Sequence, residues 1–87
     1  MKRWAIIFRA LANVNRLKIV KLLSQRGRLT VTELSNELDI SLGATSKHLI
    51  MLHNLDVLEP TGKDGHVYYS LRTQIPADTQ KALKVFL

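Results

Sequence analysis

Two helix-start signals within residues 30–55 constrain this chain more than any other feature. Thr30 precedes Glu33 by three residues, the spacing of a capping box, in which each side chain hydrogen-bonds the other residue's backbone N–H. An apolar stripe typical of a short helix follows: Val31, Leu34 and Leu38. Asp39 and Ile40 fit a turn, and Ser41 is a second N-cap candidate. The stretch therefore predicts two helices joined by a tight turn.

The second of these helices, expected from Ser41 to about Asn54, has two distinct faces. At 100° per residue one side holds Thr45, His48, Leu49 and Leu52, with Leu42 at its margin. The opposite side holds Gly43, Ser46, Lys47 and Ile50. A major groove is wide enough to admit a helix, and a helix N-terminus favours phosphate. We therefore expect a helix-turn-helix that contacts duplex DNA through Ser41, Gly43, Ala44, Ser46 and Lys47.

Residues 2–12 predict an amphipathic first helix, because their apolar side chains follow helical spacing. These side chains are Trp4, Ile7, Phe8 and Leu11. They can form core, or they can form a dimer surface, since a terminal helix in a small domain has little else to bury against. We include all four in the candidate dimer interface.

A second, more apolar helix is expected to begin at Asn13 or Asn15 and to end at Arg26, with Gly27 as its stop. Arg16 lies in its first turn, where it could tether the DNA backbone or anchor the fold. It joins the candidate DNA-binding residues. The following segment, 28–30, is short but could add an edge strand to a later hairpin.

A hairpin is expected after the helix-turn-helix, with strands at 57–61 and 66–71 around the segment 62–65. This segment ends in Asp-Gly, a strong hairpin signal because both residues tolerate positive φ. A hairpin directly after a recognition helix is a wing. Lys63 and His66, near its tip, could contact phosphate or a minor groove.

The last segment predicts a helix over about 76–86, with Pro76 near its start. Leu83 and Phe86 are its candidate interface residues. This helix could pair with the first helix, either in the same chain or in a partner. The whole sequence thus predicts a single domain over 1–87 in the α+β class. It is mostly helical: a winged helix-turn-helix with a two-stranded β wing and flanking N- and C-terminal helices.

Charge and composition favour a protein that binds a polyanion and argue against a membrane protein. The net charge of +6 and the pI near 10.1 suit a polyanionic partner such as duplex DNA. Residues 1–30 hold eight Lys or Arg and no acid, whereas residues 31–87 hold five basic and seven acidic residues, so the positive charge precedes the recognition helix. Arg9 interrupts the apolar run after Lys2-Arg3, and no stretch has the length of a membrane span, so we expect a cytoplasmic protein without membrane contact.

Three other chemistries find little support in the sequence. The chain has no cysteine and only three histidines, His48, His53 and His66. His48 and His53 are five residues apart, which does not place them on one helix face, so no metal site is expected. No glycine-rich phosphate loop or Ser-His-Asp order is present, so we expect neither an enzyme nor a bound cofactor.

The alternative to a DNA-binding regulator is a winged-helix module that binds protein or RNA without reading an operator. Ile50 and Met51, which are apolar at or near the outer face of the second helix, are the one hint of it.

Three sequence blocks resemble the ArsR-type winged-helix repressors. Residues 8–20, FRALANVNRLKIV, are similar to the family's FKALADPTRLRIL, with Val14 where the family usually has Pro. Residues 40–49, ISLGATSKHL, are similar to its LSQSTVSRHL, and residues 65–71, GHVYYSL, to its GRxVYYRL wing. The three blocks occur in the family's order and spacing.

The resemblance implies a homodimer, formed by the first and last helices, that represses transcription by binding a palindromic operator through the helix starting at Ser41. By carry-over, Ser46 and Lys47 occupy positions that the family uses for DNA contact, and His48 matches the family's histidine. Many members sense metal through a Cys-x-Cys pair, whose positions here are Thr30 and Thr32. Others use Asp and His ligands on the last helix, but residues 73–87 contain Asp78 and no His. Metal sensing by either route is therefore not expected.

Overall fold

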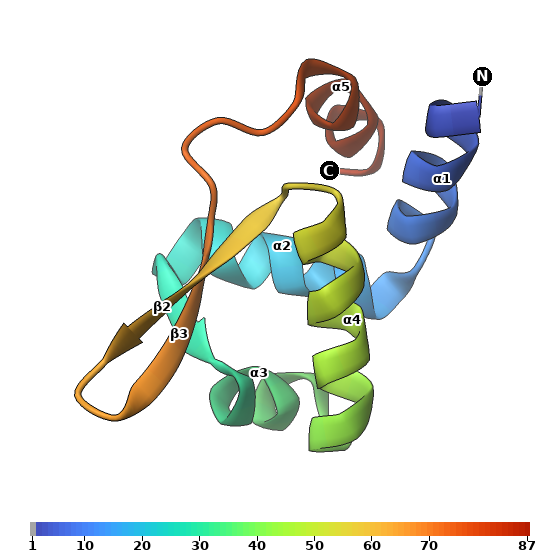
Figure 1. Ribbon diagram of the computed structural model, residues 1–87. Helices are drawn as coiled ribbons and strands as arrows, with labels where there is room; N and C mark the ends of the chain where they lie inside the picture. The colour runs from blue at the N-terminus through green and yellow to red at the C-terminus, as the bar shows by residue number, and fades with distance from the viewer. Residues whose placement is uncertain (1) are drawn as a thin grey trace.

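The computed structural model describes residues 2–87, which form five helices and three strands in the expected order (Figure 1). They are α1 (Lys2–Leu11), α2 (Val14–Arg26), β1 (Arg28–Thr30), α3 (Val31–Leu38), α4 (Leu42–Asn54), β2 (Leu58–Lys63), β3 (His66–Leu71) and α5 (Ala77–Phe86). The fold is a winged helix-turn-helix, as predicted. Within the described residues, no helix combines the length and apolar character that a membrane crossing requires.

Local capping defines the helix-turn-helix, as the sequence predicted. The Thr30 hydroxyl accepts from the Glu33 N–H at 3.2 Å, and the Glu33 carboxylate accepts from the Thr30 N–H at 2.9 Å. Asp39 ends α3 in the left-handed region at φ 55°. The Ser41 hydroxyl then caps α4 by accepting from the Ala44 N–H at 3.0 Å. The N-caps determine where each helix begins, and together with the end of α3 at Asp39 they determine the position and length of the turn between α3 and α4.

The sheet is antiparallel with strand order β1-β3-β2. Its first strand is the short segment 28–30, which the sequence suggested as an edge strand. β2 ends at Lys63, two residues beyond the expected 57–61, because Asp64 and Gly65 alone make the turn at φ 53° and 79°. A two-residue turn lets strand pairing continue to the tip, where Lys63 lies opposite His66.

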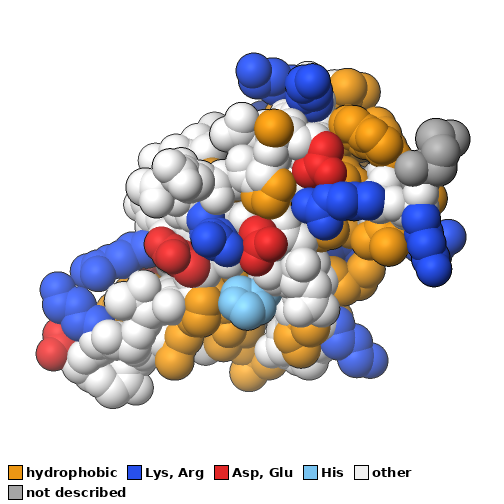
Figure 2. Space-filling model, turned by 45° about the horizontal axis from the view of Figure 1, so that its top comes forward, with side chains coloured by type: hydrophobic (Ala, Val, Ile, Leu, Met, Phe, Trp, Pro, Cys, Tyr) orange, Lys and Arg blue, Asp and Glu red, His pale blue; other side chains and the backbone are white. Residues whose placement is uncertain are grey.

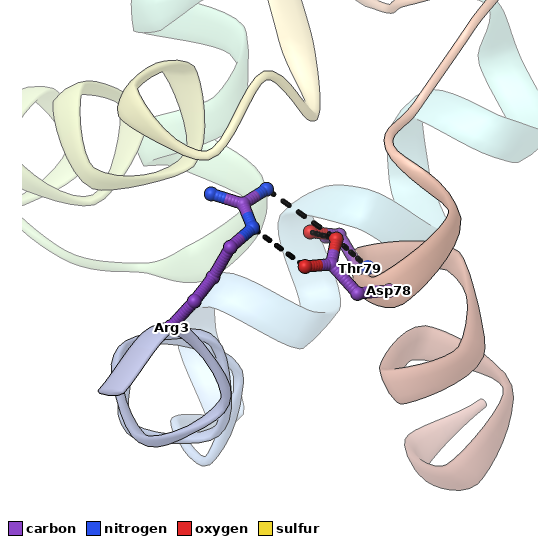
Figure 3. Close-up of polar contacts among 3 residues, drawn as sticks. All are labelled: Arg3, Asp78 and Thr79. Carbon is purple, nitrogen blue, oxygen red and sulfur yellow. Dashed lines mark hydrogen bonds and ion pairs between the residues drawn. The ribbon is translucent and has the colours of Figure 1, made fainter. Parts of the chain in front are cut away.

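The core forms where α1, α2 and α4 meet the sheet and α5. Its fully buried side chains come from nearly every element, and they include Ile7, Leu11, Ile19, Leu34, Leu49, Leu52 and Leu58. α5 packs beside α1 in the same chain, which is one of the two pairings the sequence left open (Figure 1). A hydrogen-bonded ion pair joins the first turns of these helices, with Arg3 donating to Asp78 (Figure 3).

Candidate nucleic-acid interface

The outward face of α4 is open, as the helical wheel predicted. Gly43, Ser46 and Lys47 are exposed and Ala44 is half-buried. Thr45, Leu49 and Leu52 are buried on the opposite side of the same helix. The core therefore holds α4 by one face and leaves the small and polar residues of the other face free for a partner.

The N-terminal end of α4 allows close approach. A Cβ added at Gly43 would meet only the Ser41 hydroxyl oxygen, at 4.0 Å, so packing within the chain does not require a glycine there. The Ser41 hydroxyl serves as the N-cap, and its carbonyl accepts from the Thr45 hydroxyl at 2.9 Å. The helix dipole makes this end locally positive, which suits a phosphate group.

The hairpin of β2 and β3 projects from the body of the domain (Figure 1). Lys63 and His66 are exposed next to its turn, where the sequence placed them. Figure 2 shows Lys and Arg side chains along this projection, with acidic side chains among them. The wing carries Glu59 and Asp64 as well as Lys63, so Lys63, and not the net charge of the hairpin, is what could contact a phosphate backbone away from α4.

A row of side chains on the sheet, which the sequence did not reveal, leads from the body of the domain toward the wing tip. The Arg28 guanidinium lies 4.6 Å from the centre of the Tyr68 ring, and the Tyr68 and His66 rings are 6.3 Å apart in an edge arrangement. The row exists only because β1 pairs with β3, placing Arg28 opposite Ser70. No local pattern in residues 28–30 could have predicted that register.

Arg16, one of the candidate DNA-binding residues, points into the protein. Only 9% of the residue is exposed, and its guanidinium donates to the carbonyls of Arg9 and Ala10 and to His48 Nδ1. Burial also lowers the pKa of the guanidinium. Of the two roles the sequence allowed, the structure favours the anchor of the fold, because these bonds direct the side chain into the protein.

The candidate dimer residues divide into two groups. Ile7 and Leu11 are fully buried within the single chain, and Leu83 is 9% exposed, so these three side chains belong to its core. Trp4 and Phe8 are each 38% exposed, and Phe86 is half-buried. The Trp4 and Phe8 rings stack at 5.7 Å between centres, and those of Phe8 and Phe86 lie 6.0 Å apart. Figure 2 shows apolar side chains gathered beside α1 and α5.

Comparison with known proteins places the chain in a family. The model for the arsR family of bacterial regulatory proteins matches residues 13–59, more than half of the 87 residues. The match runs from the N-cap of α2 through the helix-turn-helix into β2. The chain belongs to the ArsR family.

Individual ArsR-family proteins agree with this assignment. The chain is 33% identical over 79 residues to the arsenic resistance transcriptional regulator ArsR1 of Pseudomonas putida, covering 91% of this chain and 62% of that protein. It is 32% identical over 73 residues to the transcriptional repressor SdpR of Bacillus subtilis, covering 84% of this chain and 80% of SdpR. The chain thus spans less than two thirds of the length of ArsR1.

A solved structure supports the same fold. The crystal structure of NolR from Sinorhizobium fredii superposes with a TM-score of 0.78 at 27% identity, covering 94% of this chain and 78% of that one.

This ArsR-family chain does not offer the side chains of a thiophilic metal site at the start of α3. Thr30 and Thr32 carry hydroxyls where thiolates would be needed, and the Thr30 hydroxyl is engaged as the helix cap. On α5, Asp78 pairs with Arg3 and accepts from the Thr79 N–H. Within residues 2–87, no three His, Cys, Asp or Glu side chains cluster in a way that could hold a metal ion.

Proposed function

We propose that this protein is a cytoplasmic, sequence-specific repressor that binds duplex DNA as a homodimer and does not sense metal through the family's cysteine pair. One observation carries the proposal: the exposed face of α4, with Gly43, Ser46 and Lys47, lies on the same domain as a projecting wing. A helix that is small and polar on its free face fits a major groove. The family supports the proposal, because its named members include regulators of transcription.

The proposed DNA-contacting side chains differ in the part of the duplex that each can bind. Ser46 can donate or accept and so reads base edges loosely, whereas Lys47 reaches either a guanine or a phosphate. Lys63 and His66 on the wing supply phosphate or minor-groove contacts away from α4. Because the Arg16 guanidinium is hydrogen-bonded to Ala10 and His48 within the protein, the proposed DNA interface does not use it.

The aromatic cluster of α1 and α5 supports a second copy as partner. Trp4 and Phe8 expose more than a third of their surface beside half-buried Phe86. Exposed aromatic groups of this kind are enriched at protein interfaces. A two-fold dimer would present two α4 helices to a palindromic operator, because operator symmetry mirrors that of the protein.

The proposal is tested by comparing two variants that remove the same charge. Ser46→Ala with Lys47→Ala should weaken binding to a specific duplex by at least about tenfold, since each base contact is worth roughly 1–3 kcal/mol. Lys81→Ala, on the exposed side of α5, is the control and should change affinity by less than about threefold. Equal losses in the two proteins, measured by fluorescence anisotropy, would reject α4 as the reading helix.

A second candidate function rests on the apolar side chains of α4. Ile50 is 59% exposed and Met51 is 38% exposed, which suits a protein-docking helix better than a DNA-reading one. If this module binds protein or RNA in place of an operator, Ile50→Ser should abolish partner binding while the double variant of Ser46 and Lys47 leaves it intact. The opposite pattern would reject this candidate.

A further inference from the structure

One buried guanidinium links three helices. Arg16, in the first turn of α2, donates through Nε to the Ala10 carbonyl and through Nη2 to the Arg9 carbonyl, at the end of α1. Its Nη1 lies 3.0 Å from Nδ1 of His48 on α4. The same side chain therefore holds the end of the helix that bears Trp4 and Phe8 and the middle of the helix that bears Ser46 and Lys47.

The Arg16–His48 bond has only one workable protonation state. A guanidinium can only donate, so His48 Nδ1 must accept, and the neutral ring then carries its proton on Nε2. Protonation of Nδ1 would remove the acceptor and set an imidazolium against the buried Arg16 guanidinium, in a position where His48 is half-buried. The two backbone carbonyls do not have this sensitivity, because a carbonyl accepts at any ordinary pH.

We propose that Arg16 and neutral His48 act together as positioning residues that hold α4 against α1 and α2 in the orientation that DNA binding requires, so that protonation of His48 releases α4 and weakens operator binding. The inference rests on the proposed function and adds proton control to it. Neither residue touches DNA in this account; both act through the placement of the exposed face of α4.

The surroundings of His48 favour its neutral form. Burial lowers the pKa of His48, and the charge of Arg16 lowers it further. The acids of α3 are engaged elsewhere: Glu37 pairs with Arg26 at 2.6 Å, and Glu33 caps Thr30. On β2, which also packs against α4, Glu59 and Lys63 are exposed. On α1, Arg9 contributes its carbonyl to Arg16.

The sign of the effect follows from the direction of that shift. A histidine whose pKa is lower in the folded than in the unfolded chain stabilises the fold fully above its unfolded pKa, about 6.5. The contribution is lost as the pH falls from there through the folded pKa. Below the folded pKa, apparent DNA affinity should fall by up to about tenfold per protomer for each pH unit, because only the neutral form is competent.

The experiment is done in a His66→Gln background, and it compares the protein that keeps His48, called the wild type in this experiment, with His48→Gln and His48→Ala between pH 7.5 and pH 5.0. The His66→Gln substitution removes the imidazole from the wing, so that only the histidines of α4 differ among the variants. The side-chain amide oxygen that His48→Gln introduces can accept from Arg16 and does not titrate, whereas His48→Ala leaves Arg16 without that acceptor. His53→Gln, an exposed position on the same helix, is the matched control.

Two readouts separate this inference from the proposed function. Backbone amide NMR shifts of 45–52, recorded without DNA, should titrate together with the His48 ring in the wild-type and His53→Gln backgrounds and stay fixed in His48→Gln. Affinity for a specific duplex should fall on acidification in those same two proteins, stay level in His48→Gln, and be low at every pH in His48→Ala.

Two results would overturn the inference. The first is a loss of duplex affinity on acidification that is as large in His48→Gln as in the wild type. The second is a set of α4 amide shifts that do not change as the His48 ring titrates. If the amides follow His48 but no duplex binds specifically at any pH, the positioning contact stands and the proposed function fails.

Discussion

Arg3 Nε lies 2.5 Å from Asp78 Oδ2, although the two residues are 75 positions apart in the chain (Figure 3). Asp78 also accepts from the Thr79 N–H at 2.8 Å, so one carboxylate both bonds a backbone N–H in the first turn of α5 and ties that helix to α1. These bonds, with the hydrogen bond from Arg3 the largest cause, hold the pKa of Asp78 below its usual range. The pair links the two helices that carry the exposed aromatic cluster.

Replacing Asp78 with Asn should change how stability depends on acid. A carboxylate whose pKa is depressed in the folded state stabilises the fold above its unfolded pKa, about 3.9, and that stability is lost as the pH falls through the folded pKa. Asp78→Asn should therefore be less stable than the wild type at pH 7, with the two urea midpoints converging as the pH falls through the folded pKa of Asp78. Midpoints that stay equally far apart across this range would show that the ion pair contributes nothing.

Gly43→Ala should separate folding from DNA binding. Apart from the neighbouring residues and the backbone of α4 itself, the nearest atom to the added Cβ is the Ser41 hydroxyl oxygen at 4.0 Å, and alanine has a higher helix propensity than glycine. The variant should keep its stability or gain up to about 1 kcal/mol, measured by urea unfolding. Its duplex affinity should fall, because the methyl group blocks close approach of the α4 N-terminus to DNA. Unchanged affinity in a stable variant would place that end of α4 away from the duplex.

The wing turn offers a matched pair of glycines. Gly65 has φ +79°, where a Cβ strains the backbone even though no atom lies within 4 Å, whereas Gly62 is equally open without a positive φ. Gly65→Ala should destabilise the protein by about 1–2 kcal/mol, and Gly62→Ala by much less. Thermal unfolding of the two variants checks this difference. Similar losses at both positions would mean that the turn backbone does not determine the effect.

The exposed aromatic rings should control the oligomeric state. Substituting both Trp4 and Phe8 with Ser should raise the dimer dissociation constant by at least about tenfold, since buried aromatic anchors at interfaces are often worth 2 kcal/mol or more. Val67→Ser, at a wing position that is 50% exposed, is the control and should leave dimerisation unchanged. Sedimentation equilibrium that gives the same dimer constant for the aromatic variant and the wild type would remove this surface from the proposed interface.

The parts of the fold that the sequence predicted are those that short-range chemistry determines. Thr30 and Glu33 cap each other across one helical turn, Ser41 caps the next helix, and Asp64-Gly65 turns the wing. The inward and outward faces of α4 followed from helical periodicity alone. In each case the partners are only a few residues apart, so a local pattern contains the information.

The features that the sequence missed depend on contacts between distant segments. Arg16 and His48 are 32 residues apart, and Arg3 and Asp78 are 75 apart. Ile7 and Leu11 share an apolar stripe with Trp4 and Phe8, but only the packed fold shows that the first two face the core. A helical wheel identifies an apolar face without saying how much of it the same chain will cover.

The central claim, sequence-specific binding of duplex DNA, is tested most directly by fluorescence anisotropy. The protein would be titrated into duplex from upstream of its own gene and into scrambled duplex of the same composition, at low and at moderate salt. The account predicts tighter binding to the upstream duplex and a preference that persists as salt rises. Equal, weak binding to both duplexes that collapses with salt would show phosphate attraction alone and contradict the claim.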